Sequence, residues 1–385
     1  MKFLHIADLH LGKMVHNFRM LDDQEYMLGK LLKVVDERKI DTVLIAGDVY
    51  DQSIPSEGAV RLFDEFLCEL AGRKVNTFII SGNHDSGERL GFGRRLFASN
   101  DIHICTKYQG RLEKHTVMDE TGPVHIYLLP YLTAAQIRNL FPDEIIRSYE
   151  DAIRVILKGE DIDTSQRNIL VAHQFVTAGG MGMEFSGSES RSREQVGTVE
   201  MIHADCFEAF DYVALGHIHS SYAVAWDTIR YSGSLLKYSA SEAGHKKSFP
   251  VGIMGGKGDI QLEEVSPAPK HDVRCLRGGL KQLLAEENRI NTEDYVFVTL
   301  TDENPVMDVI GTIRQYYPNV MQVSYDNTYS NDRDSFDFND YQKRKNFDEL
   351  IKDFFMMMYD REMDEKDLRL MKEIAREAGV TDETN

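Results

Sequence analysis

The chain has 385 residues, of which 42% are hydrophobic and 28% charged, a profile that fits two or three globular domains and excludes disordered or collagen-like classes. The formal net charge of -19 argues against non-specific binding to the phosphates of nucleic acid. The 4 cysteines are scattered, which gives neither a thiolate zinc site nor a disulfide framework; with no apolar run near the ~20 residues of a membrane span and early N-terminal charge, we expect a cytoplasmic protein.

The first half of the chain alternates short apolar runs with amphipathic segments. Apolar runs at 3–7, 42–46 and 75–80 are separated by segments with helical spacing, at about 21–38 and 56–70. This order predicts a parallel sheet covered by helices. Two later strands are expected at 168–172 and 211–215. All five strands end in polar residues, and ligands gather beyond the carboxyl ends of such strands.

The second half suggests several smaller parts. Residues 177–197 form a Gly- and Ser-rich loop, which is either a variable surface excursion or a substrate loop. The Pro-containing segment 266–269 indicates a domain boundary. After it we expect a helix at 279–287, a strand at 295–300, a helix at 306–316 and a strand at 320–325. The predicted division is a main domain at 1–265, a small α+β capping domain at 266–329, a linker at 330–346 and amphipathic C-terminal helices at 347–385.

The chemical signal is a set of oxygen and nitrogen ligands at the predicted strand ends. They occur in the motifs D-L-H at 8–10, G-D-V-Y-D at 47–51, G-N-H-D at 82–85 and G-H-I-H at 216–219, together with a single histidine at 173. The candidate metal ligands are Asp8, His10, Asp48, Asn83, His173, His217 and His219. One residue separates Asp8 from His10, and in an extended chain such residues share a face. Carboxylate, imidazole and amide without thiolate are typical of a hydrolytic divalent-metal site.

The number of ligands favours two metal ions over one, because a single four-coordinate ion needs only three or four of the seven. Asp48 is the natural carboxylate to bridge two cations, which would generate hydroxide and clamp phosphoryl oxygens. His84 follows Asn83 directly, so both are not expected on the same ion. A cationic imidazole there could stabilise the leaving oxygen, with Asp51 or Asp85 orienting it; the alternative is a packing role.

Four basic residues near these motifs are candidates for substrate binding: Arg89, Arg191, Arg193 and Lys237. Together with Arg94, Arg95, Lys246 and Lys247 they could form a local basic rim despite the acidic total.

These motifs resemble the calcineurin-like metallophosphoesterase superfamily. The block S-G-N-H-D-S-G-E-R-L at 81–90 is similar to the SbcD family of nuclease subunits, as are F-D-Y-V-A-L-G-H-I-H at 210–219 and Y-S-G-S-L-L-K-Y-S at 231–239. The similarity is strong over about residues 1–265. It implies a four-layer α-β-β-α sandwich and a Mn²⁺-dependent DNA phosphodiesterase, acting as a 3′-to-5′ exonuclease on duplex ends and as an endonuclease on single strands and hairpins.

The resemblance also implies roles and partners. One metal ion would take Asp8, His10, Asp48 and His219, and the other Asp48, Asn83, His173 and His217, with His84 as the transition-state histidine. The family implies DNA as substrate, a coiled-coil ATPase of the SbcC type bound by the C-terminal helices, and a homodimer within a heterotetramer. An apolar helical face at 347–358 after a flexible linker supports partner binding independently, although it could also dock on its own domain.

Two other functions stay open from the sequence. The first is another enzyme of the superfamily that acts on a small phosphodiester or phosphomonoester; it would need only the first ~265 residues. The second is a non-catalytic scaffold in a DNA-end complex. The complete ligand set speaks against a scaffold, and the capping and C-terminal segments speak for the nuclease.

Overall fold

The structure is a computed structural model that describes residues 1–178, 201–304, 306–326, 366–368 and 370. The chain divides into two compact units. The first comprises Met1–Leu276, Leu284–Val298 and Asp308–Val323, and the second comprises Arg277–Leu283, Thr299–Met307 and Ser324–Asn385. In the described part of the chain, none of the helices has the length and apolar character needed to cross a membrane. The domain boundaries expected from the sequence stay predictions.

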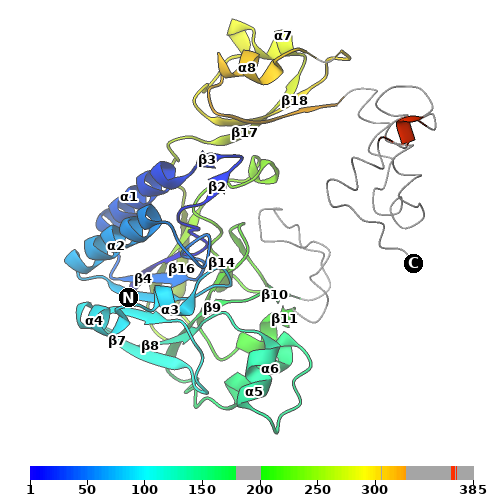
Figure 1. Cartoon of the computed structure of the whole chain (residues 1–385). Helices are drawn as coiled ribbons and strands as arrows, with labels where there is room; N and C mark the ends of the chain where they lie inside the picture. Colours follow the sequence, from blue (N-terminus) through cyan, green and yellow to red (C-terminus); the bar gives the residue numbers. More distant parts are fainter. Residues whose placement is uncertain (179–200, 305, 327–365, 369, 371–385) are drawn as a thin grey trace. The chain divides into compact units, whose positions relative to one another are not determined.

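The first unit contains a six-stranded sheet with the order β16-β15-β1-β4-β5-β6 (Figure 1). Its strands are β1 (Lys2–Ile6), β4 (Thr42–Ala46), β5 (Asn76–Ile80), β6 (Ile102–Cys105), β15 (Phe249–Met254) and β16 (Ile260–Val265). The four strands β1, β4, β5 and β6 are parallel, and β15 and β16 add an antiparallel edge. The parallel part therefore matches the sequence prediction.

A second six-stranded sheet has the order β13-β14-β12-β9-β8-β7. Its strands are β7 (Glu113–Asp119), β8 (Gly122–Leu129), β9 (Arg167–His173), β12 (Tyr212–Gly216), β13 (Tyr222–Ala223) and β14 (Ile229–Tyr231). The central strands β8, β9, β12 and β14 are parallel. The two edge strands pair antiparallel. The carboxyl ends of β9 and β12 are thus brought side by side, with Gly216 paired to His173.

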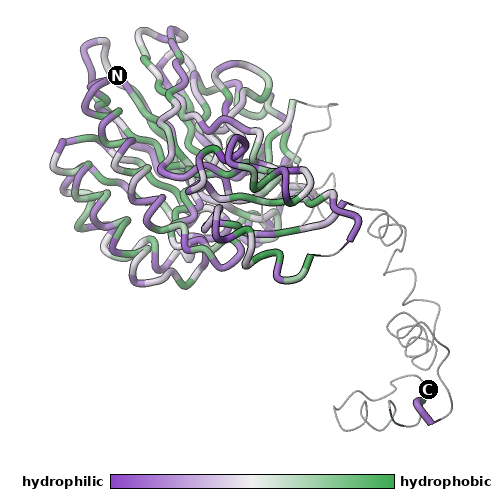
Figure 2. Tube along the Cα trace, turned by 90° about the horizontal axis from the view of Figure 1, so that it is seen from above, coloured by the Kyte–Doolittle hydropathy of each residue, from purple (hydrophilic) through white to green (hydrophobic). Residues whose placement is uncertain are grey.

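Successive side chains along the central strands face opposite sides of each sheet, and this alternation creates the layers. Val43 and Ile45 of β4 pack with helices α1 (Leu21–Arg38) and α2 (Glu57–Gly72), whereas Leu44 and Ala46 join the core between the sheets. On the other sheet, β9 does the same against α5 (Ala134–Leu140) and α6 (Tyr149–Lys158). Strands buried on both faces require such helical cover. Figure 2 shows hydrophobic stretches along the strands and alternating polar and apolar turns along the outer helices. The predicted four-layer sandwich is confirmed.

Local sequence explains where the covering helices begin and end. Ser56 caps α2 by accepting a hydrogen bond from the Ala59 N–H. Ser148 and Asp151 form a reciprocal capping box at the start of α6. Helix α1 ends at Lys39, which adopts a left-handed conformation with φ 54°. These ends fix the helices that connect the parallel strands.

The remaining elements are short. They are β2 (Met14–Val15), β3 (Phe18–Arg19), α3 (Gly87–Leu90), α4 (Arg94–Phe97), β10 (Val176–Thr177), β11 (Ile202–His203), β17 (Val273–Gly278), α7 (Leu280–Leu283), β18 (Tyr295–Leu300), α8 (Val309–Arg314) and β19 (Val320–Tyr325), with four 3₁₀ turns among the described residues. The strands β17, β18 and β19 form a three-stranded sheet.

The two helices predicted after residue 278 are shorter than expected. The segment 279–287 is helical only over α7, because the chain is extended at Ala285 before a 3₁₀ turn. The segment 306–316 is helical over α8, where the Asp308 side chain accepts from the Gly311 N–H and so sets the start. Both strands in this region lie where they were predicted. The expected loop at 177–197, the linker and the C-terminal helices fall almost wholly outside the described residues.

Candidate metal centre

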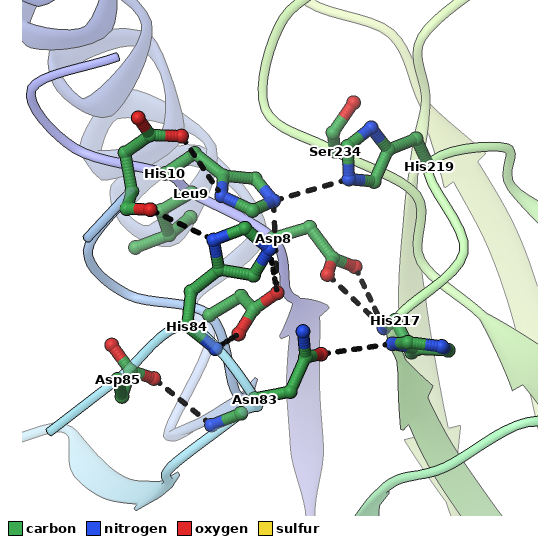
Figure 3. Close-up of polar contacts among 12 residues, drawn as sticks. Asp8, Leu9, His10, Asn83, His84, Asp85, His217, His219 and Ser234 are labelled. Atoms are coloured by element: carbon green, nitrogen blue, oxygen red, sulfur yellow. Dashed lines mark hydrogen bonds and ion pairs between the residues drawn. The ribbon is translucent and has the colours of Figure 1, made fainter. Parts of the chain in front are cut away.

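The ends of five parallel strands bring all seven predicted ligands together. Figure 3 labels Asp8, His10, Asn83, His217 and His219 among them. Asp8 and His10 follow β1, Asp48 follows β4, and Asn83 follows β5. The other three come from the second sheet: His173 ends β9, and His217 and His219 follow β12. The site therefore lies where the carboxyl ends of both sheets meet, as expected for a ligand site in an α/β fold.

The backbone at the site differs from the extended conformation predicted for it. Asp8, His10, Asp48 and His217 have φ values of 51°, 44°, 50° and 99°. Left-handed backbone at a residue other than glycine is uncommon and costs of order 1–3 kcal/mol. The prediction that Asp8 and His10 share a face through strand alternation is therefore wrong. The chain instead turns sharply after each strand, and the turns direct the side chains inward.

One half of the cluster contains Asp8, His10 and His219. Their candidate ligand atoms all lie within 4.8 Å of one another, and all three residues are buried. The Nε2 atoms of His10 and His219 are 3.1 Å apart. The Oδ2 atom of Asp48 lies 3.7 Å from the His10 Nε2. One carboxylate and two imidazoles thus converge on a space beside Asp48.

The other half is centred on the side-chain oxygen of Asn83. This oxygen lies 3.1 Å from the Nε2 of His173 and 3.0 Å from the Nδ1 of His217. The Oδ2 atom of Asp48 lies 3.5 Å from the same Nε2 of His173. The Nδ1 of His173 faces the Ala46 carbonyl oxygen at 2.7 Å, so its Nε2 is directed into the cluster. Asp48 is therefore shared between the two halves.

The electrostatics fit a centre that holds cations. Burial lowers the pKa of His10 to about 4 and that of His217 to about 3, so both imidazoles are neutral and have a free lone pair. Burial would raise the pKa of Asp48, but His173, His10 and His84 outweigh it and hold that pKa well below its usual range. Burial would likewise lower the pKa of His173, yet Asp48 raises it to about 9. Converging lone pairs around an ionised carboxylate suit divalent metal ions.

His84 lies beside the cluster and is better placed to act on a substrate than to bind metal. Its Nδ1 is 2.8 Å from the backbone carbonyl oxygen of Asp51, which can only accept, so Nδ1 carries the proton. Its Nε2 then points toward Asp48, 4.0 Å from Oδ2. The side chain is 20% exposed, whereas His10 and Asp48 beside it are almost fully buried. A partly exposed imidazole at the rim can reach an incoming group.

The carboxylate of either Asp51 or Asp85 was expected to orient His84, and the structure corrects this expectation. It is the main chain of Asp51 that orients His84, while its carboxylate lies 2.6 Å from the Lys13 ammonium and 3.5 Å from the His10 Nδ1. The Asp85 carboxylate accepts hydrogen bonds from the N–H groups of Val49, Tyr50 and Gly82. These bonds hold the turns after β4 and β5 together because backbone N–H groups in turns need partners.

Two glycines in the motifs are required by close approach. A side chain at Gly82 would collide with the Asp48 carboxylate, and one at Gly216 would collide with the Ala46 carbonyl oxygen. Both contacts join loops that carry ligands. Gly216 therefore permits the two sheets to approach at the metal centre, and Gly82 permits the loops after β4 and β5 of one sheet to approach each other.

Of the four basic residues predicted to contact the substrate, Arg89 is exposed and Lys237 is largely buried. Arg89 is exposed, and its guanidinium donates to the Ser53 carbonyl oxygen at 3.0 Å, close to the His84 loop in sequence. Lys237 is only 11% exposed and forms an ion pair with Asp272 at 2.9 Å. Its ammonium also donates to the Ala243 carbonyl oxygen. The prediction that Lys237 belongs to a basic surface is therefore wrong, because its ammonium group is paired with Asp272 and the Ala243 carbonyl oxygen inside the protein. Arg191 and Arg193 lie outside the described residues.

Sequence reasoning missed several residues that support the ligands. Gln24 donates from Nε2 to the His10 carbonyl oxygen at 2.8 Å. Glu242 is fully buried and lies 3.9 Å from the Nδ1 of His219, and Lys247 donates to the His219 carbonyl oxygen at 2.7 Å. The block at 231–239 pointed to this region, but nothing in its spacing indicated that residues 242 and 247 would reach back to the metal centre.

Comparison with known proteins identifies the family. The family model of the calcineurin-like phosphoesterases matches residues 1–221. The SbcD subunit of the nuclease SbcCD from Staphylococcus epidermidis is 32% identical over 328 residues, which are 84% of this chain and 85% of that protein. The chain belongs to the calcineurin-like phosphoesterases, in the family of the SbcD nuclease subunits. A second model, described as the type 5 capsule protein repressor C-terminal domain, matches residues 269–359 of this phosphoesterase.

Two solved structures are also similar to this phosphoesterase. TT1561 of Thermus thermophilus is 10% identical with a TM-score of 0.38, covering 68% of this chain and 98% of that one. A dimetal phosphatase from Danio rerio is 11% identical with a TM-score of 0.39, covering 69% and 96%. The family assignment rests on the sequence relationships given above.

Membership of this family confirms several predictions made from the sequence. The chain is a metal-dependent phosphoesterase, and the expected likeness to the SbcD nuclease subunits is confirmed over most of its length. The relationship supports a nuclease over an enzyme that acts on a small phosphoester, because it extends well beyond residue 265. Use of divalent metal ions is supported by the family and by the Asp and His cluster.

Proposed function

We propose that this chain is the nuclease subunit of a DNA-end-processing complex and that it depends on Mn²⁺. It would act as a 3′-to-5′ exonuclease on duplex DNA and as an endonuclease on single strands and hairpins, in repair and recombination. The observation that carries the proposal is the convergence of seven ligands around Asp48 in a chain related over 84% of its length to a nuclease subunit.

The geometry supports two four-ligand metal sites that share one carboxylate. Asp8, His10, Asp48 and His219 would hold one ion, and Asp48, Asn83, His173 and His217 would hold the other. The first set has its imidazole Nε2 atoms facing each other, and the second faces the Asn83 oxygen. Two divalent ions held by these residues would lower the pKa of a water molecule and neutralise the charge on phosphoryl oxygens.

The protein's own groups would then position the phosphodiester. His84 presents Nε2 toward the cluster while the Asp51 carbonyl fixes its Nδ1 proton. A second proton on Nε2 would make it a cation that stabilises the transition state and donates to the leaving oxygen. Arg89, beside this loop in sequence and exposed, is a candidate to bind the DNA backbone, and Arg191 and Arg193 remain candidates on sequence grounds.

The partner and location follow from the same relationship. We propose that residues 347–385 bind a coiled-coil ATPase of the SbcC type, that residues 266–329 form a capping domain after the nuclease domain at 1–265, and that 330–346 is a linker. A homodimer within a heterotetramer is expected. A cytoplasmic location is supported by four free cysteines, because thiols stay reduced there.

The test compares two substrates with and without the ATPase partner. Purified protein should degrade linear duplex DNA in the presence of Mn²⁺, and a chelator should stop it. The net charge of -19 predicts weak DNA binding by the chain alone and tight binding with the partner. Cleavage confined to a small phosphodiester would contradict the DNA nuclease and favour the small-substrate enzyme.

A further inference from the structure

His219, like His173 and His10, directs its second ring nitrogen toward an oxygen of the protein. His173 is held through Nδ1 by a backbone carbonyl, and His10 faces the Asp51 carboxylate. His219 directs Nε2 toward His10 and Nδ1 toward Glu242, whose Oε1 lies 3.9 Å away. Histidines that bind metal ions usually donate their other ring N–H to a carboxylate or carbonyl, which fixes the ring and its tautomer.

Glu242 is held in place by a set of donors from its own segment. It ends the 3₁₀ turn Ala240–Glu242 and has no exposed surface. The Tyr238 N–H and the Ser239 hydroxyl donate to Oε1, each at 3.2 Å, and the Lys247 ammonium donates to Oε2 at 2.5 Å. A buried carboxylate is costly unless it is paired and hydrogen-bonded. These three donors offset the cost of burying the Glu242 carboxylate beside the metal centre.

Lys247 links the same carboxylate to the main chain of His219. Its ammonium donates to the His219 carbonyl oxygen and to the Ser234 hydroxyl, each at 2.7 Å, in addition to Glu242. The Ser234 N–H donates to the same His219 carbonyl at 3.1 Å. Figure 3 shows Ser234 beside His219. Both the backbone and the imidazole of His219 therefore face one buried ion pair.

We propose that Glu242, held by Lys247, is a positioning residue that orients His219 for metal binding. The proposal rests on the metal-ligand role proposed for His219. A normal N–H···O hydrogen bond needs the 3.9 Å gap to close by about 1 Å. Such bonds are often long without the bound group and tighten in the working complex. With the carboxylate in place, Nδ1 keeps its proton and Nε2 keeps its lone pair for the metal ion.

The test is Mn²⁺ binding by Glu242→Gln, measured by calorimetry, with Glu263→Gln as the matched control. Glu263 is an exposed carboxylate paired with Arg38, away from the centre. Loss of such an outer partner costs 10- to 100-fold in metal affinity, so one of two Mn²⁺ ions should bind about 10- to 100-fold more weakly. Cleavage should lose kcat with KM for DNA unchanged. Glu263→Gln should behave as wild type.

The double variant Glu242→Gln/Lys247→Met covers failure of the single variant to fold, since it leaves no unpaired buried cation. Wild-type Mn²⁺ affinity in a folded single or double variant would overturn the proposal. A readout without substitution is NMR of the wild-type protein loaded with Zn²⁺: a slowly exchanging Nδ1 proton on His219 is expected, and its absence contradicts the proposal. If the wild-type protein binds no Mn²⁺, the proposed function fails. If the wild-type protein binds Mn²⁺ and the Glu242 variants bind it equally tightly, this inference alone fails.

Discussion

The charge of Asp48 should set the protonation of His173 in the metal-free protein. The two side chains are 3.5 Å apart, and at an effective dielectric constant of about 20 their attraction is about 5 kcal/mol. At 1.36 kcal/mol per pKa unit, removing it lowers the pKa of His173 by about 3.5 units. Asp48→Asn should therefore move that pKa from about 9 to about 6 or lower. Asparagine keeps the hydrogen bond that Oδ1 accepts from the His84 N–H, so the loop should stay folded.

The assay is an NMR titration of the histidine ring resonances in the presence of a chelator. Asp205→Asn is the control, because Asp205 pairs with the surface histidine His203 at 2.9 Å and should leave His173 unchanged. The Asp48→Asn protein should also be inactive, since it lacks the shared carboxylate. A pKa of His173 that stays near 9 in Asp48→Asn would refute the electrostatic reasoning.

Three further predictions follow from the same structure. His84→Ala should lose about 10²- to 10⁴-fold in kcat with Mn²⁺ binding intact by calorimetry; full activity would remove its catalytic role. Asp119 accepts from Arg167 and from the Met1 ammonium, at 2.6 and 2.7 Å, and Arg167 chiefly holds the pKa of Asp119 well below its usual range. Its stabilisation is complete above the unfolded pKa of about 3.9 and is lost as pH falls through the folded pKa, so Asp119→Asn should cost about 2–3 kcal/mol in urea unfolding at pH 7 and progressively less below pH ~4. Mn²⁺ added at about 100 times its Kd should raise the free energy of unfolding of the metal-free protein by about 2.7 kcal/mol, measured by thermal unfolding. This stabilisation should be smaller in Asp48→Asn.

The strands and the main covering helices could be predicted because the local spacing of their apolar residues indicates which faces are buried. Residues 43–46 are all apolar because both faces of β4 are covered, and the apolar spacing of 21–38 matches α1 along its whole length. The helices after residue 278 were overestimated, because end points there depend on Asp308 and on the extended residue Ala285. Such local turns have no periodic signal.

The metal centre shows the same division. The convergence of the seven candidate ligands was predictable because each lies at or just after the end of a strand, six of them in recognisable motifs. The left-handed backbone that directs Asp8 and His10 was not predictable. Lys237 appeared to be a surface contact because its ion pair with Asp272 spans 35 residues of sequence. The roles of Glu242 and Lys247 beside His219 were missed for a similar reason. Contacts between distant segments are set by packing, which a single sequence does not display.

The most direct test of the two-metal centre is anomalous diffraction from crystals of the protein soaked in Mn²⁺. We predict two peaks about 3.5–4 Å apart, both bound by Asp48, with His10 and His219 on one ion and His173 and His217 on the other. A single peak, or two peaks that do not share Asp48, would contradict the proposed centre.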